Sequence, residues 1–504
     1  MPKKYLNKIL NARVYDVATE SPLDEAKSLS ARVGNKVLIK REDLQAVFSF
    51  KLRGAYNKML HLTDAEKECG VIAASAGNHA QGVALAGKKL GVPVTIVMPE
   101  TTPSIKVEAV GNWSPRIVLH GDDYQEAYER AMEIAEAEKL TFVHPFDDPD
   151  VIAGQGTVGM EILRQCTEDI DAIFVPVGGG GLIAGIAAYV KAVRPEVKII
   201  GVEPEDAASM TRSLEAKRRI TLKQVGIFAD GVAVAKVGKE PFRLARKLVD
   251  DMVLVSVDEI CAAVKDVFDD TRHISEPAGA LSVAGLKKYA AQHGLKGKTL
   301  VAINSGANVN FDRLRHISER SDIGENRETL FAVTIPEQPG SFRKFCSILG
   351  KRSVTEFNYR YADEAEAQIF VGIKLSGGQE EKERLLSLFR DGGYAVTDLS
   401  DNDTAKLHIR YMIGGRPRNL SDEVVYRFQF PERPGALLKF LNHFGKRWNI
   451  SLFHYRNHGS AFGRVLCGMQ VPKSEMPQFK KFLKNLGYSH WSETKNPVYK
   501  AFLN

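Results

Sequence analysis

The sequence predicts an α/β fold in which open, mostly parallel sheets carry helices on both faces, followed by an α+β tandem repeat at the C-terminal end. Two observations predict this organisation. Residues 1 to about 310 alternate short apolar runs with amphipathic stretches, a pattern typical of parallel strands connected by covering helices. The last third of the chain contains two copies of one sequence pattern, which indicates a duplicated small module.

The apolar runs of the first part predict buried strands, and the stretches between them predict helices. "HAQGVALAGKKLG" follows one such run and places Ala80, Val83, Ala84 and Gly87 at helical spacing. "AIFVPVGGGG" predicts a strand that ends in glycines, with a helix from Leu182. The segments predicted to contain strands are 71–75, 94–99, 172–181, which runs into the glycines, 197–204 and 299–307.

A charged segment separates the two parts. "RLRHISERSDIGENR", residues 313–327, has almost no apolar periodicity after Ile317, so we expect the end of a helix followed by a linker. The predicted domains are a first domain at 1–312, this linker, and two repeats at 328–415 and 422–504.

The two repeats align over their turns and strands. Pro336–Gly340 matches Pro431–Gly435 at a separation of 95 residues, and Phe357–Arg360 matches Phe453–Arg456 after a one-residue insertion. Each copy predicts a strand, a proline-glycine turn, an amphipathic helix, two strands, a helix and a final strand.

Composition bounds the class of protein. A chain of 504 residues predicts two to four domains, and its 44% hydrophobic and 26% charged residues are ordinary for a globular protein. The net charge of +7 is small and scattered, which argues against a dedicated nucleic-acid binder. Five dispersed cysteines without a C-x-x-C motif, no visible secretory signal and no apolar stretch of membrane-spanning length favour a reduced, cytoplasmic protein.

Four consecutive glycines, Gly178 to Gly181, lie between a predicted strand and a predicted helix. Glycine lets backbone N–H groups converge on an anion at a helix N-terminus, so this loop is a candidate phosphate site; a purely structural loop remains the alternative. The loop matches neither G-x-G-x-x-G nor G-x-x-x-x-G-K-[ST], and no acidic residue is placed for a ribose, which disfavours a nucleotide-dependent oxidoreductase.

Two further polar loops follow predicted strands. "SAGNHAQG", Ser75 to Gly82, could hold a carboxylate or a ring oxygen, although by itself it is better explained as a helix cap. Within it we expect His79 on the surface rather than as a catalytic base. "INSGAN", Ile303 to Asn308, is either a turn or a ligand loop. Three such loops at strand ends favour one shared ligand site.

Lys51, in "SFKLRG", taken alone would be an exposed lysine. An amine that bonds to an aldehyde cofactor is a functional alternative, and together with the glycine loop it indicates pyridoxal phosphate.

Taken in order, "EDLQAVFSFKLRGA", "SAGNHAQG", "PVGGGGL" and "INSGAN" resemble the pyridoxal-phosphate enzymes of the tryptophan-synthase-β fold type, fold type II. Within these, the sequence is most similar to the threonine deaminases, also called threonine ammonia-lyases or threonine dehydratases, over roughly residues 10–312. The doubled C-terminal module resembles the two ACT-like units of the regulatory domain in the biosynthetic form.

The resemblance implies a lyase that uses pyridoxal 5'-phosphate to convert L-threonine to 2-oxobutanoate and ammonia, the first step of isoleucine biosynthesis, and L-serine to pyruvate. It also implies inhibition by isoleucine, activation by valine and a homotetramer. The alternatives are another enzyme of this fold type, such as a serine racemase or dehydratase, a β-replacement enzyme or a threonine synthase, and a non-enzymatic amino-acid sensor.

The resemblance also implies roles for individual residues. Lys51 would link covalently to the cofactor and then act as the base, Asn78 would bond the ring oxygen, and Ser305 would face the pyridine nitrogen. The substrate carboxylate would lie against the loop that contains Ser75, Ala76, Gly77, Asn78 and His79. The cofactor phosphate would bind to Gly178, Gly179, Gly180, Gly181 and Leu182.

Four positions receive weaker assignments. Glu203 could help to hold a cation as in some relatives, but Ser209 stands where serine racemases have a second carboxylate, so a divalent metal is doubtful. The repeat alignment places Tyr359 and Tyr455 near effector pockets, with core aromatics as the equal alternative. For Arg53 we expect only a salt bridge near the following helix.

Overall fold

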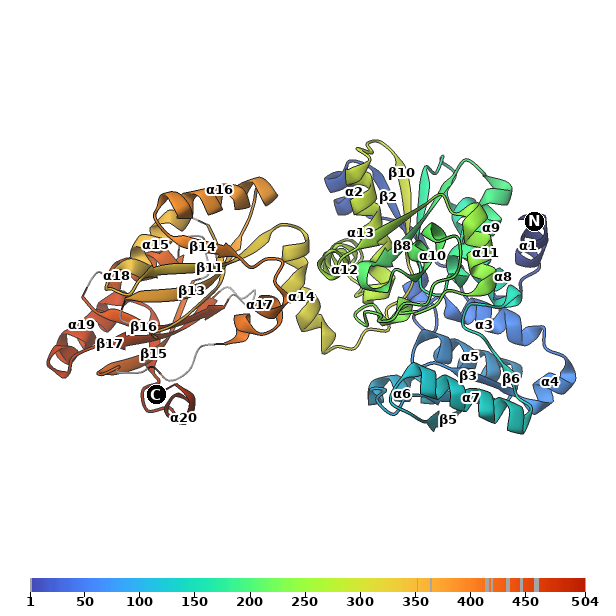
Figure 1. Ribbon diagram of the computed structural model, residues 1–504, viewed down its shortest axis with the longest axis horizontal. Helices are drawn as coiled ribbons and strands as arrows, with labels where there is room; N and C mark the ends of the chain where they lie inside the picture. The colour runs from blue at the N-terminus through green and yellow to red at the C-terminus, as the bar shows by residue number, and fades with distance from the viewer. Residues whose placement is uncertain are drawn as a thin grey trace. The chain divides into compact units, whose positions relative to one another are not determined.

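The computed structural model describes residues 2–350, 352–362, 365–412, 417, 420–431, 436–444, 447–456 and 462–503. It divides into two compact units, Met1–Ser321 and Asp322–Asn504, each described by itself below (Figure 1). Among the described residues, no helix is both long and apolar enough to cross a lipid bilayer.

The described strands of the first unit form two sheets, a six-stranded large sheet in the order β1-β2-β10-β7-β8-β9 and a four-stranded small sheet in the order β5-β4-β3-β6. Neighbouring strands are parallel except at the edge, where β1 pairs antiparallel with β2. The mostly parallel α/β architecture is therefore confirmed. The large sheet consists of β1 (Leu23–Glu25), β2 (Lys36–Arg41), β7 (Ala172–Pro176), β8 (Lys198–Pro204), β9 (Asp251–Val255) and β10 (Thr299–Asn304). The small sheet consists of β3 (Val71–Ala74), β4 (Val94–Met98), β5 (Arg116–Leu119) and β6 (Thr141–Phe142).

Helices cover both faces of the large sheet because its central strands are apolar on both sides. Ala172 and Phe174 of β7 pack toward α2 (Lys27–Val33), α12 (Val257–Thr271) and α13 (Pro277–Gln292). The alternate residues of β7, Ile173 and Val175, pack toward α8 (Pro149–Gln165) and α9 (Gly181–Val193).

The small sheet is covered in the same way. Val71 and Ala73 of β3 face α3 (Lys51–Leu60) and α5 (Asn78–Leu90), whereas Ile72 and Ala74 face α7 (Tyr124–Glu138). The other helical segments of this unit are α1 (Pro2–Leu10), η1 (Glu42–Leu44), α4 (Asp64–Cys69), α6 (Ser104–Gly111), η2 (Glu205–Ala207), α10 (Ser209–Glu215), η3 (Asp230–Val232) and α11 (Lys239–Leu248).

The segment expected to be a helix end and a linker is mostly helical. Helix α14 spans Arg313–Gly324, and only three residues separate it from the first strand of the second unit. Ile317 is buried in the core of the first unit, and Arg320 pairs with Asp258. Because few residues of α14 are buried and apolar, the apolar periodicity of the sequence gave little indication of this helix.

The described strands of the second unit form one eight-stranded antiparallel sheet in the order β14-β11-β13-β12-β16-β17-β15-β18. The two copies meet where β12 pairs with β16, with Tyr359 opposite Phe453 and Tyr455 opposite Phe357. The first copy contains β11 (Glu328–Pro336), α15 (Ser341–Leu349), β12 (Val354–Arg360), β13 (Glu366–Lys374), α16 (Gly378–Asp391) and β14 (Ala395–Asp398). The second contains β15 (Glu423–Pro431), α18 (Ala436–Phe444), β16 (Asn449–Arg456), β17 (Phe462–Gln470), α19 (Met476–Leu486) and β18 (Ser489–Ser492).

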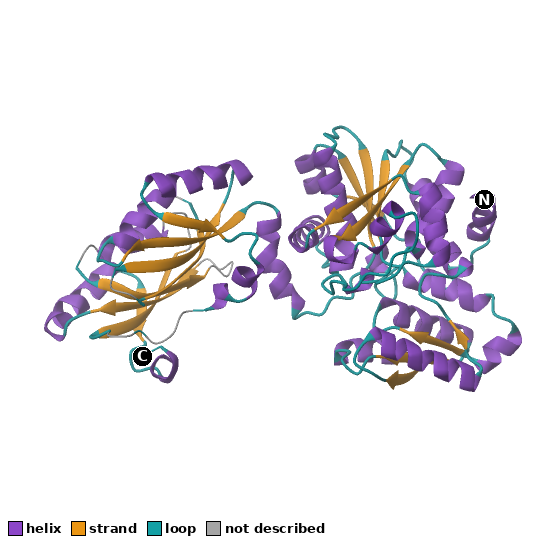
Figure 2. Ribbon diagram, in the orientation of Figure 1, coloured by secondary structure: helices purple, strands orange, loops and turns teal. Residues whose placement is uncertain are grey.

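This order of elements confirms the predicted repeat. Figure 2 shows the strands of this unit in orange, with helices in purple beside them. Of the matched turn in the second copy, the residues from Glu432 to Gly435 lie outside the described residues. The four long helices pack on one face of the sheet around Phe331, Phe345, Phe440 and Phe479. The remaining helical segments are α17 (Asp403–Leu407), η4 (Ile409–Tyr411), η5 (Lys473–Glu475) and α20 (Pro497–Phe502).

Candidate active site

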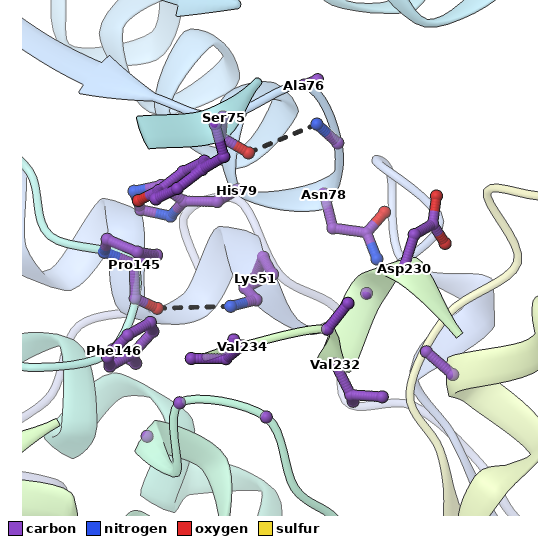
Figure 3. Close-up of a pocket in the computed structure, with 18 of the residues that line it drawn as sticks. Lys51, Ser75, Ala76, Asn78, His79, Pro145, Phe146, Asp230, Val232 and Val234 are labelled. Atoms are coloured by element: carbon purple, nitrogen blue, oxygen red, sulfur yellow. Dashed lines mark hydrogen bonds between the residues drawn. The ribbon is translucent and has the colours of Figure 1, made fainter. Parts of the chain in front are cut away.

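A cavity of about 1030 Å³ lies in the first unit, and strand ends of both sheets line it. From the small sheet come Ala74 and the loop Ser75–His79; from the large sheet come Pro176, the glycine loop and Ser305. Lys51 also lines this cavity (Figure 3). The structure therefore brings together all three loops and the lysine that the sequence singled out.

Lys51 is the first residue of α3, and its Nζ donates a hydrogen bond to the carbonyl oxygen of Pro145 at 3.3 Å (Figure 3). Burial lowers the pKa of this amine to about 8, although the negative charge of Glu276 opposes part of that shift. A lysine with this pKa is a far better base and nucleophile at neutral pH than a solvated one.

The segment before Lys51 is paired with the loop that contains Ser305. Ser49 forms a β-bridge with Gly306, and the N–H of Phe50 donates to the carbonyl oxygen of Ser305 at 3.3 Å. These bonds fix Lys51 relative to Ser305, whose own hydroxyl is buried and donates to the carbonyl oxygen of Ala278 at 3.3 Å.

The glycine loop is a tight cradle in which side chains have no room. A Cβ on Gly179 would lie 2.1 Å from the ring of Phe146, and a Cβ on Gly178 would lie 2.9 Å from the Cα of Val232. Gly180 has φ +93°, in the region that favours glycine. Helix α9 begins at Gly181, so its first N–H groups have no partner within the helix and the positive end of its dipole lies at this loop. The cradle suits a phosphate group.

Asn78 begins α5, and its side-chain amide is held on both edges. Its Nδ2 donates to Oε1 of Glu276 at 2.8 Å, and its Oδ1 accepts from Nδ2 of Asn308 at 2.6 Å. Glu276 is buried, and burial together with the charge of Asp230 raises its pKa to about 7. Asn78, Glu276 and Asn308 all line the cavity.

His79 is buried, so the expectation of a surface position was wrong. Its Nε2 donates to the carbonyl oxygen of Val143 at 2.8 Å, and burial together with the Lys51 charge lowers its pKa to about 3. The first turn of α5 packs near the end of β6 and lines the cavity. The position of His79 in the helix sequence alone does not reveal these contacts. His79 is thus a neutral, fixed part of the cavity wall.

The rest of the Ser75–His79 loop has exposed polar groups at the cavity. Ser75, Ala76 and Gly77 are only partly buried, and the N–H of Gly77 donates to Oγ of Ser75 at 3.3 Å. The loop directly precedes α5, so the helix dipole favours a carboxylate here.

Glu203 is buried, but its carboxylate oxygens are already engaged. They accept from the N–H of Met210 at 2.7 Å and from the N–H and Oγ1 of Thr211 at 2.8 and 2.7 Å. Within the described ranges there is no group of three or more His, Cys, Asp or Glu residues that could hold a metal ion. The carboxylate thus stabilises the start of α10.

Arg53 forms buried ion pairs, not the salt bridge near the following helix that we expected. Its Nε lies 2.8 Å from Glu42 and its Nη1 lies 2.5 Å from Glu161, while Nζ of Lys40 lies 2.6 Å from Glu161. All four side chains are fully buried. The partners come from β2, η1 and α8, so the cluster fixes α3 two residues after Lys51.

In the second unit both tyrosines assigned to effector pockets are buried in the core. The Tyr359 hydroxyl donates to Glu337, whose Oε1 accepts from Nδ2 of Asn449 at 2.9 Å. A cavity of about 10 Å³ next to this link is lined by residues of both copies, including Gln338 and Asn449, and by neither tyrosine. The counterpart of Glu337 in the second copy, Glu432, lies outside the described residues.

Sequence reasoning missed several residues of the cavity. Glu276 precedes a proline at a helix start and looks like a cap, and Asn308 was quoted in its motif without a role. Phe146, Lys106 and Asp230 line the cavity from loops and a helix without a motif.

Comparisons with known proteins agree with this geometry. Residues 14–306 match the family described as "Pyridoxal-phosphate dependent enzyme", and residues 319–409 and 414–503 match the C-terminal regulatory domain of threonine dehydratase. The L-threonine dehydratase biosynthetic IlvA of Burkholderia multivorans is 55% identical over 99% of each chain.

Two solved structures are similar to the first part of the chain. The processed form of threonine deaminase isoform 2 from Solanum lycopersicum matches with a TM-score of 0.63 and 53% identity, covering 64% of this chain and 88% of that one. Maize serine racemase matches with a TM-score of 0.59 and 34% identity, covering 62% and 95%.

Proposed function

The chain belongs to the pyridoxal-phosphate-dependent threonine dehydratases of the biosynthetic form, and we propose that Lys51 is the catalytic residue of its lyase reaction. One observation carries the assignment: the Lys51 amine, the glycine cradle, the Asn78 amide and the Ser305 hydroxyl all line one cavity. The reaction converts L-threonine to 2-oxobutanoate and ammonia for isoleucine biosynthesis, and we propose that L-serine gives pyruvate in the same site.

The residues present fit the cofactor edge by edge. Backbone N–H groups of Gly178, Gly179, Gly180, Gly181 and Leu182 would hold the phosphate in a cradle that a Cβ would fill. Asn78 would donate to the ring oxygen. Ser305 would present a neutral hydroxyl to the ring nitrogen; unlike a carboxylate, it does not hold a proton there, which limits electron withdrawal and side reactions.

Bound pyridoxal phosphate supplies an aldehyde for covalent attachment and a conjugated ring that withdraws electrons from the substrate Cα. Lys51 would hold that aldehyde through its amine in the absence of substrate. With substrate bound, the Lys51 Nζ would take up the Cα proton, a task for which a pKa lowered to about 8 suits it. The loop Ser75–His79 would orient the substrate by binding its carboxylate, and buried His79 and partly buried Phe146 form part of the cavity wall.

The Lys51→Ala variant tests this assignment, with Lys89→Ala, an exposed lysine of α5, as the matched control. We expect Lys51→Ala to lose both 2-oxobutanoate formation from threonine and the long-wavelength absorbance of covalently bound cofactor. Lys89→Ala should retain both. Retained turnover in Lys51→Ala would reject the catalytic role, and D-serine formation from L-serine without 2-oxobutanoate formation from threonine would favour a serine racemase.

For the second unit, we propose that isoleucine inhibits and valine activates the enzyme and that Tyr359 lies at an effector pocket. The support is the regulatory domain match and the Tyr359–Glu337–Asn449 link, which joins the two copies beside a small cavity. An effector that alters this link would couple the copies, and allosteric coupling free energies are typically about 1–3 kcal/mol.

Tyr359→Leu and Tyr359→Phe distinguish an effector role from core packing. If the hydroxyl takes part, both variants should need several-fold more isoleucine for half-inhibition, with activity without effector largely intact. If the ring serves only as core, Tyr359→Phe should respond to isoleucine as the unmodified enzyme does, which would contradict the assignment. We extend the same proposal to Tyr455 at the matching position of β16.

We further propose a cytoplasmic homotetramer. Family membership supports the assembly, and the absence of disulfide bonds among the described cysteines supports the compartment. Sedimentation of the holoenzyme tests the assembly, and a monomer or a dimer at micromolar concentration would contradict it.

A further inference from the structure

Glu276 places a carboxyl group in the wall of the candidate active site, where it also accepts a hydrogen bond from the backbone of Asn308. It precedes Pro277 at the start of α13, but its side chain makes no capping bond to that helix. Its backbone is fixed, because its N–H donates to the carbonyl oxygen of Gly306 at 3.1 Å and its own carbonyl oxygen accepts from Gly279 at 2.9 Å. The carboxyl is therefore held at the cavity, and it does not cap the helix as a side chain at this position commonly does.

The main partner of that carboxyl is the Asn78 amide. An asparagine amide has two N–H donors and one carbonyl acceptor, so its two edges differ in polarity. One donor of Asn78 binds Oε1 of Glu276 at 2.8 Å, and the acceptor receives Nδ2 of Asn308 at 2.6 Å. Turning the amide over would set oxygen against oxygen at Glu276 and donor against donor at Asn308.

The orientation of Asn308 is fixed in turn by the backbone. Its Nδ2 also donates to the carbonyl oxygen of Val47 at 2.8 Å, and a carbonyl can only accept. The polarity therefore runs in one direction from Val47 through Asn308 and Asn78 to Glu276. Among the hydrogen bonds of the described residues, this arrangement leaves the second N–H of Asn78 without an acceptor.

We propose that Glu276 and Asn308 are positioning residues that orient the Asn78 amide so that its second N–H points to the ring oxygen of the cofactor. The inference rests on the proposed role of Asn78. Neither Glu276 nor Asn308 need touch the cofactor for this role, because each acts through Asn78.

The role requires an acceptor at Glu276, and a negative charge is not essential. Asp230, Lys106 and Lys51 are the charged groups whose fields reach this carboxyl, and its pKa is raised to about 7. The group is thus partly protonated near neutral pH, yet a protonated carboxyl still accepts through its carbonyl oxygen. Glutamine offers the same acceptor, so Glu276→Gln should preserve the orientation whereas Glu276→Ala should not.

A double-mutant cycle between positions 276 and 78 tests the inference. The measurement is the dissociation constant of pyridoxal phosphate from the reconstituted full-length apoenzyme, without substrate, followed by the absorbance of bound cofactor. We expect Glu276→Ala to weaken binding roughly tenfold, as for the loss of one hydrogen bond, and Glu276→Gln to stay within about threefold. With Asn78→Ala already present, Glu276→Ala should cost less than about twofold.

Asn308→Ala provides an independent second arm, since it removes the opposite support of Asn78, and it should show the same coupling. Asp269→Asn removes an exposed carboxylate outside the cavity lining and is the control for loss of a negative charge; it should leave cofactor affinity within about twofold. Additive losses in the cycle, a loss in Glu276→Gln equal to that in Glu276→Ala, or an equal loss in Asp269→Asn would each overturn the inference. If the unmodified apoenzyme binds no cofactor, or Asn78→Ala binds it with unchanged affinity, the proposed site fails instead.

Discussion

Replacing Arg53 by methionine should destabilise the first unit strongly, because Arg53 holds two buried carboxylates. Its guanidinium bonds both oxygens of Glu42, at 2.8 Å each, and both oxygens of Glu161, at 2.5 and 3.0 Å. Lys40 is the second cation of the cluster and bonds Glu161 at 2.6 Å. The four side chains together are electrically neutral and fully buried.

The magnitude follows from the charges that remain. Arg53→Met leaves two buried carboxylates with one cation, and removing one partner of a buried ion pair typically costs about 3–5 kcal/mol. For a unit of this size, Met1–Ser321, the loss corresponds to a fall in Tm of roughly 4–8 °C. An exposed pair such as Arg130–Glu133 should contribute no more than about 1 kcal/mol, so Arg130→Ala is the matched control.

Thermal unfolding of the holoenzyme measures the effect, and a second substitution tests its cause. Arg53→Met combined with Glu42→Gln leaves Lys40 paired with Glu161 and restores neutrality, so it should recover at least half of the lost stability. A fall in Tm no larger than that of Arg130→Ala would refute the reasoning about burial. A double variant as unstable as Arg53→Met would refute the reasoning about uncompensated charge.

Two further predictions concern the proposed cofactor cradle and the Lys51 amine. Gly179→Ala should weaken cofactor binding at least about tenfold, because its Cβ would overlap the ring of Phe146. Gly111→Ala is the control and should leave binding unchanged, because its Cβ would meet only Ile117 at 4.0 Å. Equal affinities of the two variants would contradict the proposal that the glycine loop holds the cofactor. In the apoenzyme the reaction of Lys51 with an amine reagent should accelerate as pH rises through about 8, because the fraction of neutral amine increases over that range. Glu276→Gln should move the midpoint of this acceleration to lower pH, because it removes a negative charge that favours the protonated amine. A midpoint above about 10, as for a solvated lysine, would contradict the burial of this amine.

The sequence predicted the strands and the ligand loops because both depend on local patterns. Runs such as Val71–Ala74 are apolar on both faces, and the loops after them, with Asn78 or Ser305, are polar and small. Parallel strands place such loops at one edge of a sheet, so their meeting could be anticipated without coordinates. The division of the strands into two sheets that both line the cavity could not be predicted, because no single apolar segment indicates to which sheet its strand belongs.

Long-range partners could not be predicted. The buried state of His79 depends on Val143, 64 residues away, and the ion pairs of Arg53 reach residues 11 and 108 positions away. Local composition at these positions is polar, which favours a surface location on average. The role of Glu276 was hidden for the same reason, since its partner Asn78 lies 198 residues earlier.

Helix α3 packs backbone to backbone against two neighbouring helices. A Cβ on Gly82 of α5 would lie 3.1 Å from the backbone nitrogen of Leu52, and a Cβ on Gly154 of α8 would lie 2.6 Å from the carbonyl oxygen of Arg53. The backbones of three helices thus touch around the turn that begins with Lys51, and the Arg53 ion pairs lock the same turn. If Lys51 serves first as a tether and then as a base, as proposed above, its side chain must leave the cofactor and return to the same place. A lysine side chain carries about 2 kcal/mol of rotamer entropy. Because the backbone of this turn is closely packed, the conformational freedom of Lys51 is confined to its side chain, which carries the reacting amine.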